Sequence, residues 1–357
     1  MSILLISLGF FTALVVVVIA TPTLIKVAKL KHLVDEPGEE RKLHSRSVPT
    51  IGGVIIFSSI LFSYSLWFPD TGDDLHRYIR EYKYIIASLV ILFFVGVKDD
   101  IIGTAPIKKL LAHIVVAFIL VMMGETQIKG MHGLFGIWDI PEWARILLSV
   151  FVYIVIVNAF NLIDGVDGLA SGIGFITSVF FGTWFALVGN SPMALLSFIL
   201  AGSLLGFLLF NFSPAKIFMG DSGSLTIGCI ISVLVIHMIE TPASKIPDFL
   251  LSHSVPVLAM SILVYPLIDT LRVFIVRALN GQSPFSADKN HLHHRLIASG
   301  FSHAKTVLIL YAYNIVVVLS AFAFGFLNHT LAFFLSLGTA VLLASLFFAI
   351  PSKKNEI

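Results

Sequence analysis

Charged residues are scarce in this chain: aspartate, glutamate, lysine and arginine make up 12% of its 357 residues. A soluble domain carries about 25% charged residues, so the chain lacks the charge needed to cover a water-facing surface. Hydrophobic residues make up 57%, and the mean hydropathy is +0.96. These values favour a membrane protein over an ordinary soluble one.

Cysteine is almost absent as well. The single cysteine, Cys229, lies inside an apolar run, which excludes a disulfide framework and indicates a packing residue. The N-terminal segment lacks a basic stretch and a small-residue cleavage site, so we expect a retained first span and not a cleaved signal peptide. With no soluble domain and no fixed-period repeat in the sequence, we expect a single membrane domain over residues 1–357.

Long apolar runs are what the chain has instead. A helix needs about 20 apolar residues to cross a bilayer, and eleven runs of about that length predict an all-α polytopic fold. They centre on residues 3–25, 52–68, 84–97, 107–123, 146–160, 172–189, 193–210, 224–239, 255–271, 306–326 and 329–350. The third and fifth runs are short, which indicates that the polar residues at their ends lie at membrane depth.

The distribution of positive charge predicts the orientation of these spans. Cytoplasmic loops are enriched in lysine and arginine, and seventeen of the 23 such residues fall in the odd-numbered connections and the C-terminal tail. The N-terminus is therefore expected outside and the C-terminus in the cytoplasm. This topology places all the marked polar clusters on the cytoplasmic face, so one face is expected to carry the chemistry.

Two adjacent carboxylates, Asp99 and Asp100, follow the third apolar run. Such carboxylates repel each other unless a proton or a cation lies nearby, and their oxygens suit Mg²⁺ or Mn²⁺. The simpler alternative is a solvated helix end with Lys98 as the partner. Taken alone, the pair does not decide between these interpretations.

The segment NAFNLIDGVDG at 158–168 carries a polar side chain at every third position. These are Asn158, Asn161, Asp164 and Asp167. On a helix this spacing would align them along one side, where they could bind a base, a sugar or a metal. A helix C-cap followed by a turn would explain only one asparagine and one glycine, so the segment favours a functional site.

The segment NFSPAKIFMGDSGS at 211–224 precedes the eighth apolar run. Asp221 could be a metal ligand and Phe218 could stack on a base. The free N–H groups at the start of the following helix could bind phosphate. A simple N-cap is the alternative for this motif taken alone.

A basic loop, DKNHLHHRL at 288–296, gathers histidines and an arginine, namely His291, His293, His294 and Arg295. This composition suits phosphate or pyrophosphate binding. Zinc is the rival ligand, although HxHH lacks the i, i+4 spacing of a zinc-binding helix. Asp269, three residues before Arg272, is expected to form an intrahelical ion pair.

Five motifs occur in order along the chain: SVPTIGG, the aspartate pair, NxxNxxDGxDGL, FMGDSGSL and HLHHRL. Together they resemble the polyprenyl-phosphate N-acetylhexosamine-1-phosphate transferases, a membrane family that includes the WecA/TagO enzymes and, more distantly, MraY. The resemblance covers about residues 35–306. The interrupted triple histidine and the eleven runs are similar to the WecA/TagO branch, which implies a simple UDP-N-acetylhexosamine donor.

The resemblance implies a role for each matched residue. It implies catalysis by Asp99, Asp100, Asp164, Asp167, His291, His293 and His294. It implies substrate binding by Arg46, Lys109, Asn158, Asn161, Asn211, Phe218 and Arg295, with Lys109 on the lipid phosphate and Phe218 on uracil. It implies that Asp221, with Asp99 and Asp100, binds Mg²⁺, with Mn²⁺ as an alternative.

The implied reaction transfers GlcNAc-1-phosphate from UDP-GlcNAc to undecaprenyl or another polyprenyl phosphate. It would release UMP at the cytoplasmic face of a bacterial plasma membrane and initiate a cell-surface glycan such as lipopolysaccharide or teichoic acid. Two alternatives remain open: a phospho-MurNAc-pentapeptide transferase, and an ion-coupled transporter, which predicts midspan carboxylates that this chain almost lacks. No nucleic-acid partner is expected, and a homodimer is one option for the assembly.

Overall fold

The computed structural model describes residues 3–35, 48–69, 75–281 and 291–351. The secondary structure of these residues is helical apart from one short ladder, in which β1 (Val34–Asp35) pairs antiparallel with β2 (Val48–Pro49), and an isolated bridge between Gly130 and Asp139. The predicted all-α class is confirmed. The helices are α1 (Ile3–Leu30), α2 (Gly52–Trp67), α3 (Leu75–Ile102), α4 (Pro106–Phe118), α5 (Glu142–Leu162), α6 (Leu169–Leu187), α7 (Ser191–Asn211), α8 (Gly220–Ile239), α9 (Val255–Ile262), α10 (Val264–Leu279), α11 (Leu292–Ala298), α12 (His303–Ala323) and α13 (His329–Ala349).

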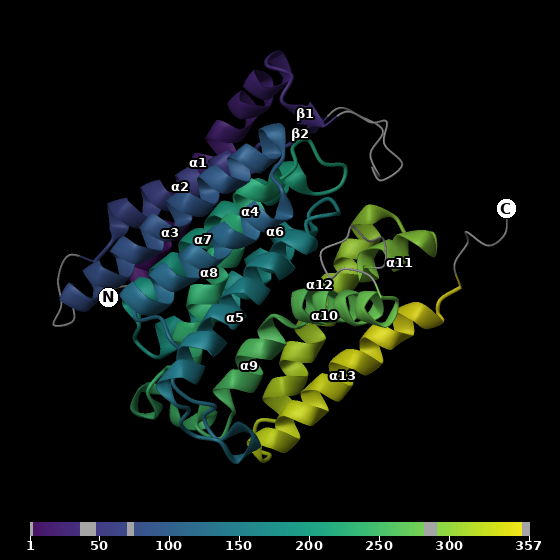
Figure 1. The fold of residues 1–357 in the computed structure, drawn as a ribbon. Helices are drawn as coiled ribbons and strands as arrows, with labels where there is room; N and C mark the ends of the chain where they lie inside the picture. Colours follow the sequence, from purple (N-terminus) through teal and green to yellow (C-terminus); the bar gives the residue numbers. More distant parts are fainter. Residues whose placement is uncertain (1–2, 36–47, 70–74, 282–290, 352–357) are drawn as a thin grey trace.

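Helix α8 lies at the centre of the larger helical group (Figure 1). Every residue from Ser222 to Ile236 is buried, and α8 contacts α2, α3, α5 and α6. Small residues permit this close packing, since a Cβ on Gly228 would lie only 2.7 Å from the Cα of Val157 on α5. The helices that carry the aspartate motifs therefore converge on one buried helix.

Helices α9 to α13 form a second group beside the first (Figure 1). Helices α9 and α10 bend by 77° at their junction. The short helix α11, which carries most of the histidine motif, contacts α12 and α13. The second group thereby fixes the position of the histidines.

The described helices suit a lipid environment. Eight of them are long and apolar enough to cross a bilayer, and the bent pair α9–α10 would add a ninth. Large apolar side chains such as Phe11, Ile19 and Phe334 are exposed on the surface, which is unfavourable in water but not in hydrocarbon. The chain is a multi-pass membrane protein.

All eleven apolar runs fall on helices, with the run at 255–271 on the bent pair. Helix α2 has only 16 residues, however, and α3 carries charged residues at both ends. The count of eleven spans and the orientation of the chain therefore stay predictions.

Candidate active site

Asp100, at the end of α3, closes the N-terminus of α8. Its Oδ1 accepts a hydrogen bond from the Asp221 N–H (2.6 Å). Its Oδ2 accepts from the Ser222 N–H (3.1 Å) and hydroxyl (2.7 Å). A carboxylate satisfies free N–H groups at a helix start and interacts favourably with the helix dipole. The Asp100 carboxylate occupies the anion position at the N–H groups of Asp221 and Ser222, and phosphate binding at this helix start stays a prediction.

Gly220 makes this contact possible. Its φ of +70° belongs to the left-handed region, which strongly favours glycine. A Cβ at this position would lie 2.3 Å from the Thr50 carbonyl oxygen and 2.7 Å from both carboxylate oxygens of Asp100. The site therefore needs glycine here for its conformation and for its close approach to Asp100.

The SVPTIGG motif is a scaffold for the start of α8. The Gly52 N–H donates to the Phe218 carbonyl (3.0 Å), and the Gly53 N–H donates to the Met219 carbonyl (2.8 Å). A Cβ on Gly53 would lie 2.0 Å from the backbone nitrogen of Gly223. The sequence singled out this motif, but only the structure shows that its two glycines pair backbone with the 218–224 segment.

Lys109, on α4, lies between two carboxylates. Its Nζ is 3.4 Å from Oδ2 of Asp99 and donates to Oδ2 of Asp221. The other oxygen of Asp221 accepts from the Asn161 side-chain amide (2.8 Å), which also donates to the Ser224 hydroxyl (2.9 Å). Four of the predicted site residues, from α3, α4, α5 and α8, thus meet at one end of the bundle.

This donor set fits a divalent cation. The Asp99 and Asp221 carboxylates converge on one positive charge, the Lys109 ammonium. Carboxylate oxygens are also the ligands that Mg²⁺ prefers in proteins. Asp100 is less available as a ligand, because both of its oxygens are bonded to the start of α8. Asp99 and Asp221 are therefore the residues that would hold Mg²⁺, which stays a prediction.

The NAFNLIDGVDG segment is only partly helical. Its two asparagines lie on α5, but Asp164 and Asp167 lie in the turn that follows, so the interpretation as a single helical face is wrong. Asp167 accepts a hydrogen bond from the Ala215 N–H (3.0 Å). Burial, and then the negative charges of Asp221 and Asp100, raise the pKa of Asp164 well above its ordinary range. The Asp164 carboxyl group is therefore stabilised by binding a proton or by a cation beside it.

Asn211 holds this turn in place. The residue is buried, and its Oδ1 accepts from the Gly168 N–H (3.1 Å) and the Ser171 hydroxyl (2.7 Å). Its Nδ2 donates to the Ile217 carbonyl (3.0 Å). The structure thus gives Asn211 a positioning role, and its contact with substrate stays a prediction.

The three histidines gather beside the same turn. The rings of His291 and His293 stack with centroids 5.2 Å apart, and His293 and His294 lie 4.4 Å apart. A Cβ on Gly165 would lie 3.2 Å from Nε2 of His293, so the histidine motif touches the NAFNLIDGVDG segment. Burial, against the opposing charge of Asp269, lowers the pKa of His293 to about 3. This imidazole is therefore neutral at physiological pH.

For Asp269, on α10, the predicted ion pair with Arg272 is wrong. Oδ2 of Asp269 lies 2.7 Å from Nδ1 of His291, and its Oδ1 accepts from the Leu292 N–H (2.7 Å). Arg272, the expected ion-pair partner, lies over the Phe348 ring, with its guanidinium carbon 4.1 Å from the centroid. Asp269 is fully buried. Because helix periodicity relates only neighbours on one helix, it could not reveal a partner 22 residues away.

The histidine cluster also bears on the zinc alternative. Asp269, His291 and His293 offer ligand atoms within 4.8 Å of one another, the one such group found in the described ranges. The bonds that the structure shows are hydrogen bonds, from His291 to Asp269 and between His293 and the Tyr265 hydroxyl (3.2 Å). These hydrogen bonds orient the imidazoles, and zinc at this cluster stays an alternative prediction.

The hydrogen bonds of Arg295 lead away from the carboxylates of Asp99 and Asp221. Its Nη2 donates to the carbonyls of Phe348 (3.2 Å) and Ile350 (2.8 Å) at the end of α13. Cations there interact favourably with the helix dipole. The structure gives Arg295 the role of anchoring α11 to α13, and a phosphate contact stays a prediction.

The remaining predicted residues have different outcomes. The Asn158 amide donates to the Ile154 carbonyl (2.7 Å) on its own helix, and Asn158 lies 3.5 Å from His113. Phe218 is partly exposed just before α8, where it could receive a base. Arg46 lies outside the described residues.

Comparison with known proteins decides the family. A family model described as glycosyl transferase family 4 matches residues 82–239. The chain is 32% identical to a probable undecaprenyl-phosphate N-acetylglucosaminyl 1-phosphate transferase of Bacillus subtilis, over 88% of this chain and 84% of the relative. The chain belongs to glycosyl transferase family 4.

Other members of glycosyl transferase family 4 are similar over most of the chain. A decaprenyl-phosphate N-acetylglucosaminephosphotransferase of Mycobacterium tuberculosis is 33% identical, over 81% of this chain and 75% of the relative. An undecaprenyl-phosphate alpha-N-acetylglucosaminyl 1-phosphate transferase of Escherichia coli is 28% identical, over 80% of this chain and 74% of the relative. The family resemblance inferred from the five motifs is confirmed.

Proposed function

We propose that the chain transfers N-acetylglucosamine-1-phosphate from UDP-GlcNAc to polyprenyl phosphate, giving lipid-pyrophosphoryl-GlcNAc and UMP. The observation that carries the proposal is the convergence of Asp99, Lys109 and Asp221 at one end of a membrane bundle. Relatives that match most of the chain are named for this transfer. A site at helix ends suits a reaction between a water-soluble donor and a membrane-bound acceptor.

The reacting groups are both phosphates, so the site must offset their repulsion. Lys109 supplies a positive charge to orient the lipid phosphate. Of the adjacent Asp99 and Asp100, only Asp100 caps α8. The Asp99 carboxylate is therefore available to position the lipid phosphate or to accept its proton. Mg²⁺, held by Asp221 and Asp99, would neutralise the donor pyrophosphate.

The histidine cluster serves the leaving UMP. A neutral imidazole can still donate a hydrogen bond to a phosphate oxygen on which charge develops. Asp269 fixes the ring of His291 through Nδ1 and leaves its Nε2 available for substrate. This arrangement gives Asp269 a positioning role although it need not touch substrate.

The Asp269→Asn protein is expected to turn over about 10- to 100-fold more slowly than wild type, as for other residues that orient a catalytic group. Asparagine keeps the volume and can still accept from the Leu292 N–H, but it loses the charge that fixes His291. Initial rates measure the effect on turnover, and thermal denaturation in detergent measures any effect on stability. The exposed Asp248→Asn is the matched control, and wild-type turnover in Asp269→Asn would contradict the role.

The experiment that tests the proposed function uses the purified full chain in detergent. Undecaprenyl phosphate, Mg²⁺ and UDP-GlcNAc are added, and UMP release and lipid-linked product are measured. We expect both products, and both are lost with EDTA. Product only with UDP-MurNAc-pentapeptide would favour the muropeptide transferase, and no product with any UDP-sugar would contradict the transferase.

We further propose that the site faces the cytoplasm of a bacterial plasma membrane, where it would initiate a cell-surface glycan. The lysine and arginine bias and the bacterial relatives support this placement. In a Cys229→Ser background, Lys305→Cys should resist an impermeant thiol reagent in intact cells, whereas Lys245→Cys should react. The reverse pattern would overturn the orientation.

A further inference from the structure

A polar pocket of about 360 Å³ lies at the other end of the bundle. It is lined by residues from the start of α3, the segment after the π-helical turn Ile119–Met123, and the ends of α6 and α8. Helix α3 carries Arg77 in this pocket and Asp99 in the candidate active site. An α-helix rises 1.5 Å per residue, which places the two sites about 30 Å apart, the thickness of a bilayer core. The pocket is therefore a separate site.

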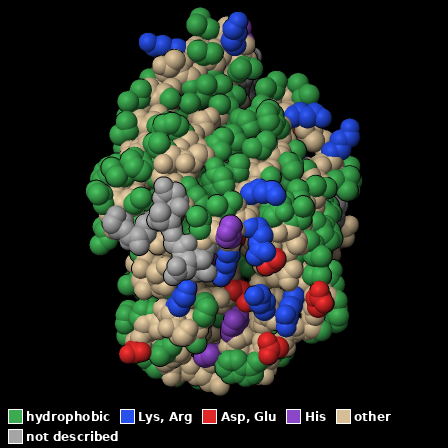
Figure 2. Space-filling model, turned by 90° about the vertical axis from the view of Figure 1, so that its left-hand side faces the viewer, with side chains coloured by type: hydrophobic (Ala, Val, Ile, Leu, Met, Phe, Trp, Pro, Cys, Tyr) green, Lys and Arg blue, Asp and Glu red, His purple; other side chains and the backbone are tan. Residues whose placement is uncertain are grey.

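Charged side chains gather around this pocket. Figure 2 shows lysines, arginines, acidic residues and histidines clustered around a hollow in the lower part of a face that is otherwise largely hydrophobic. Four lysines and arginines line the pocket together with three glutamates and His237. The cluster lies on the face that the charge bias predicts to be outside.

The acidic residues of the pocket are already engaged. Arg80 and Glu125 form a two-pronged ion pair (2.8 and 2.9 Å) that joins α3 to the segment after the π-helical turn. Arg77 pairs with the buried Glu81 (2.8 Å). Glu240 accepts from a backbone N–H (2.8 Å) and contacts His132 (3.0 Å). These contacts build the walls and leave no carboxylate of the lining without a partner.

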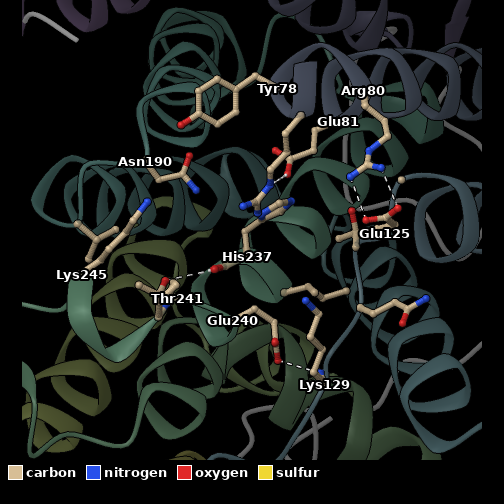
Figure 3. A pocket seen from close by; sticks show the side chains of 17 residues that line it. Tyr78, Arg80, Glu81, Glu125, Lys129, Asn190, His237, Glu240, Thr241 and Lys245 are labelled. Carbon is tan, nitrogen blue, oxygen red and sulfur yellow. Dashed lines mark hydrogen bonds and ion pairs between the residues drawn. The ribbon is translucent and has the colours of Figure 1, made fainter. Parts of the chain in front are cut away.

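In contrast to the carboxylates, several hydrogen-bond donors of the pocket have no partner among the described residues. The side-chain ammonium groups of Lys129 and Lys245 bond to no other residue of the described chain, and Figure 3 shows them extending into the pocket from different walls. The buried Nε2 of His237 has no hydrogen-bond partner among the described residues. Asn190 lies beside Lys245 in the same view. The unmatched groups are thus cations and polar groups that can donate.

We propose that this pocket binds a phosphate group, with Lys129 and Lys245 as the charged ligands and Asn190 and His237 as polar contacts. Lysine ammonium groups bind phosphate through charge-assisted hydrogen bonds, and a partly enclosed cationic pocket concentrates anions. Since the pocket lies at helix ends, the phosphate can come from a lipid headgroup or from a free anion in water. The inference does not depend on the proposed transferase reaction.

The test compares wild type with Lys129→Ala/Lys245→Ala and with the control Lys26→Ala/Lys83→Ala. The control removes two cations that do not line the pocket. In one arm, inorganic phosphate is titrated into each full-length protein in neutral detergent at constant ionic strength and followed by ³¹P line broadening. In the other arm, the proteins are reconstituted with phosphatidylcholine and phosphatidylglycerol, and retained phosphatidylglycerol is counted by native mass spectrometry.

Losing two charge-assisted contacts should weaken binding by about tenfold or more in the pocket variant but not in the control. A loss in the first arm identifies a free anion, and a loss in the second identifies a lipid headgroup. The midpoint of thermal denaturation in detergent should be unchanged in both variants, which shows that the pocket variant is folded. Equal binding by all three proteins in both arms, or no binding, would overturn the proposal.

Discussion

The Asp221→Asn protein is expected to transfer GlcNAc-1-phosphate about a thousandfold more slowly than wild type. The Asp221 carboxylate accepts from Asn161 and pairs with Lys109, and it is the first residue that would hold Mg²⁺. Asparagine preserves the shape but removes the charge on which α4, α5 and α8 converge. UMP release at a range of Mg²⁺ concentrations measures the effect.

Asp248→Asn is the control for this substitution. Asp248 is exposed in a short turn that follows the C-terminal end of α8, whereas Asp221 lies at the N-terminal start of that helix. This control should behave as wild type at every Mg²⁺ concentration. Near-wild-type turnover of Asp221→Asn at limiting Mg²⁺ would contradict the metal assignment. A thousandfold loss with unchanged thermal stability would support it.

The Gly220→Ala protein is expected to lose about a hundredfold in turnover, because small displacements of a catalytic group have effects of that size. The added Cβ would collide with the Asp100 carboxylate and the Thr50 carbonyl, so the start of α8 must move away from α3. The positive φ adds about 1–3 kcal/mol of backbone strain. Turnover measures the effect of the displaced helix start, and the midpoint of thermal denaturation in detergent measures the backbone strain.

Gly189→Ala separates backbone strain from collision. Gly189 also has a positive φ, of +73°, but a Cβ added there would meet no atom within 4 Å among the described residues. This variant should lose some stability and retain its turnover. If both glycine variants lose turnover equally, the close approach of Gly220 to Asp100 is not what the site requires.

The sequence predicted the membrane class and most of the carboxylate site. Apolar runs long enough to cross a bilayer are a local signal, and each of them falls on a helix or a bent helix pair. The site residues were recognisable because ionisable side chains at membrane depth are rare and usually functional. The structure brings Asp99, Asp221 and Asn161 into one cluster, joined through Lys109 and direct hydrogen bonds.

The functions of individual side chains within the cluster were less predictable. Asp99 and Asp100 are neighbours in sequence, yet one faces Lys109 while the other caps α8. The pairing of Asp269 with His291 joins two helices across a connection, and neither residue type nor spacing reveals it. Such roles depend on how helices pack, which residue periodicity does not specify.

The most direct test of the transferase account follows the β-phosphate of the donor. UDP-GlcNAc carrying ³²P in the β-phosphate is incubated with the full chain, polyprenyl phosphate and Mg²⁺. Transfer of the phosphosugar as a unit predicts label in the lipid product and unlabelled UMP. Label in released UDP, with an unlabelled glycolipid, would show transfer of the sugar alone and would contradict transfer of GlcNAc-1-phosphate.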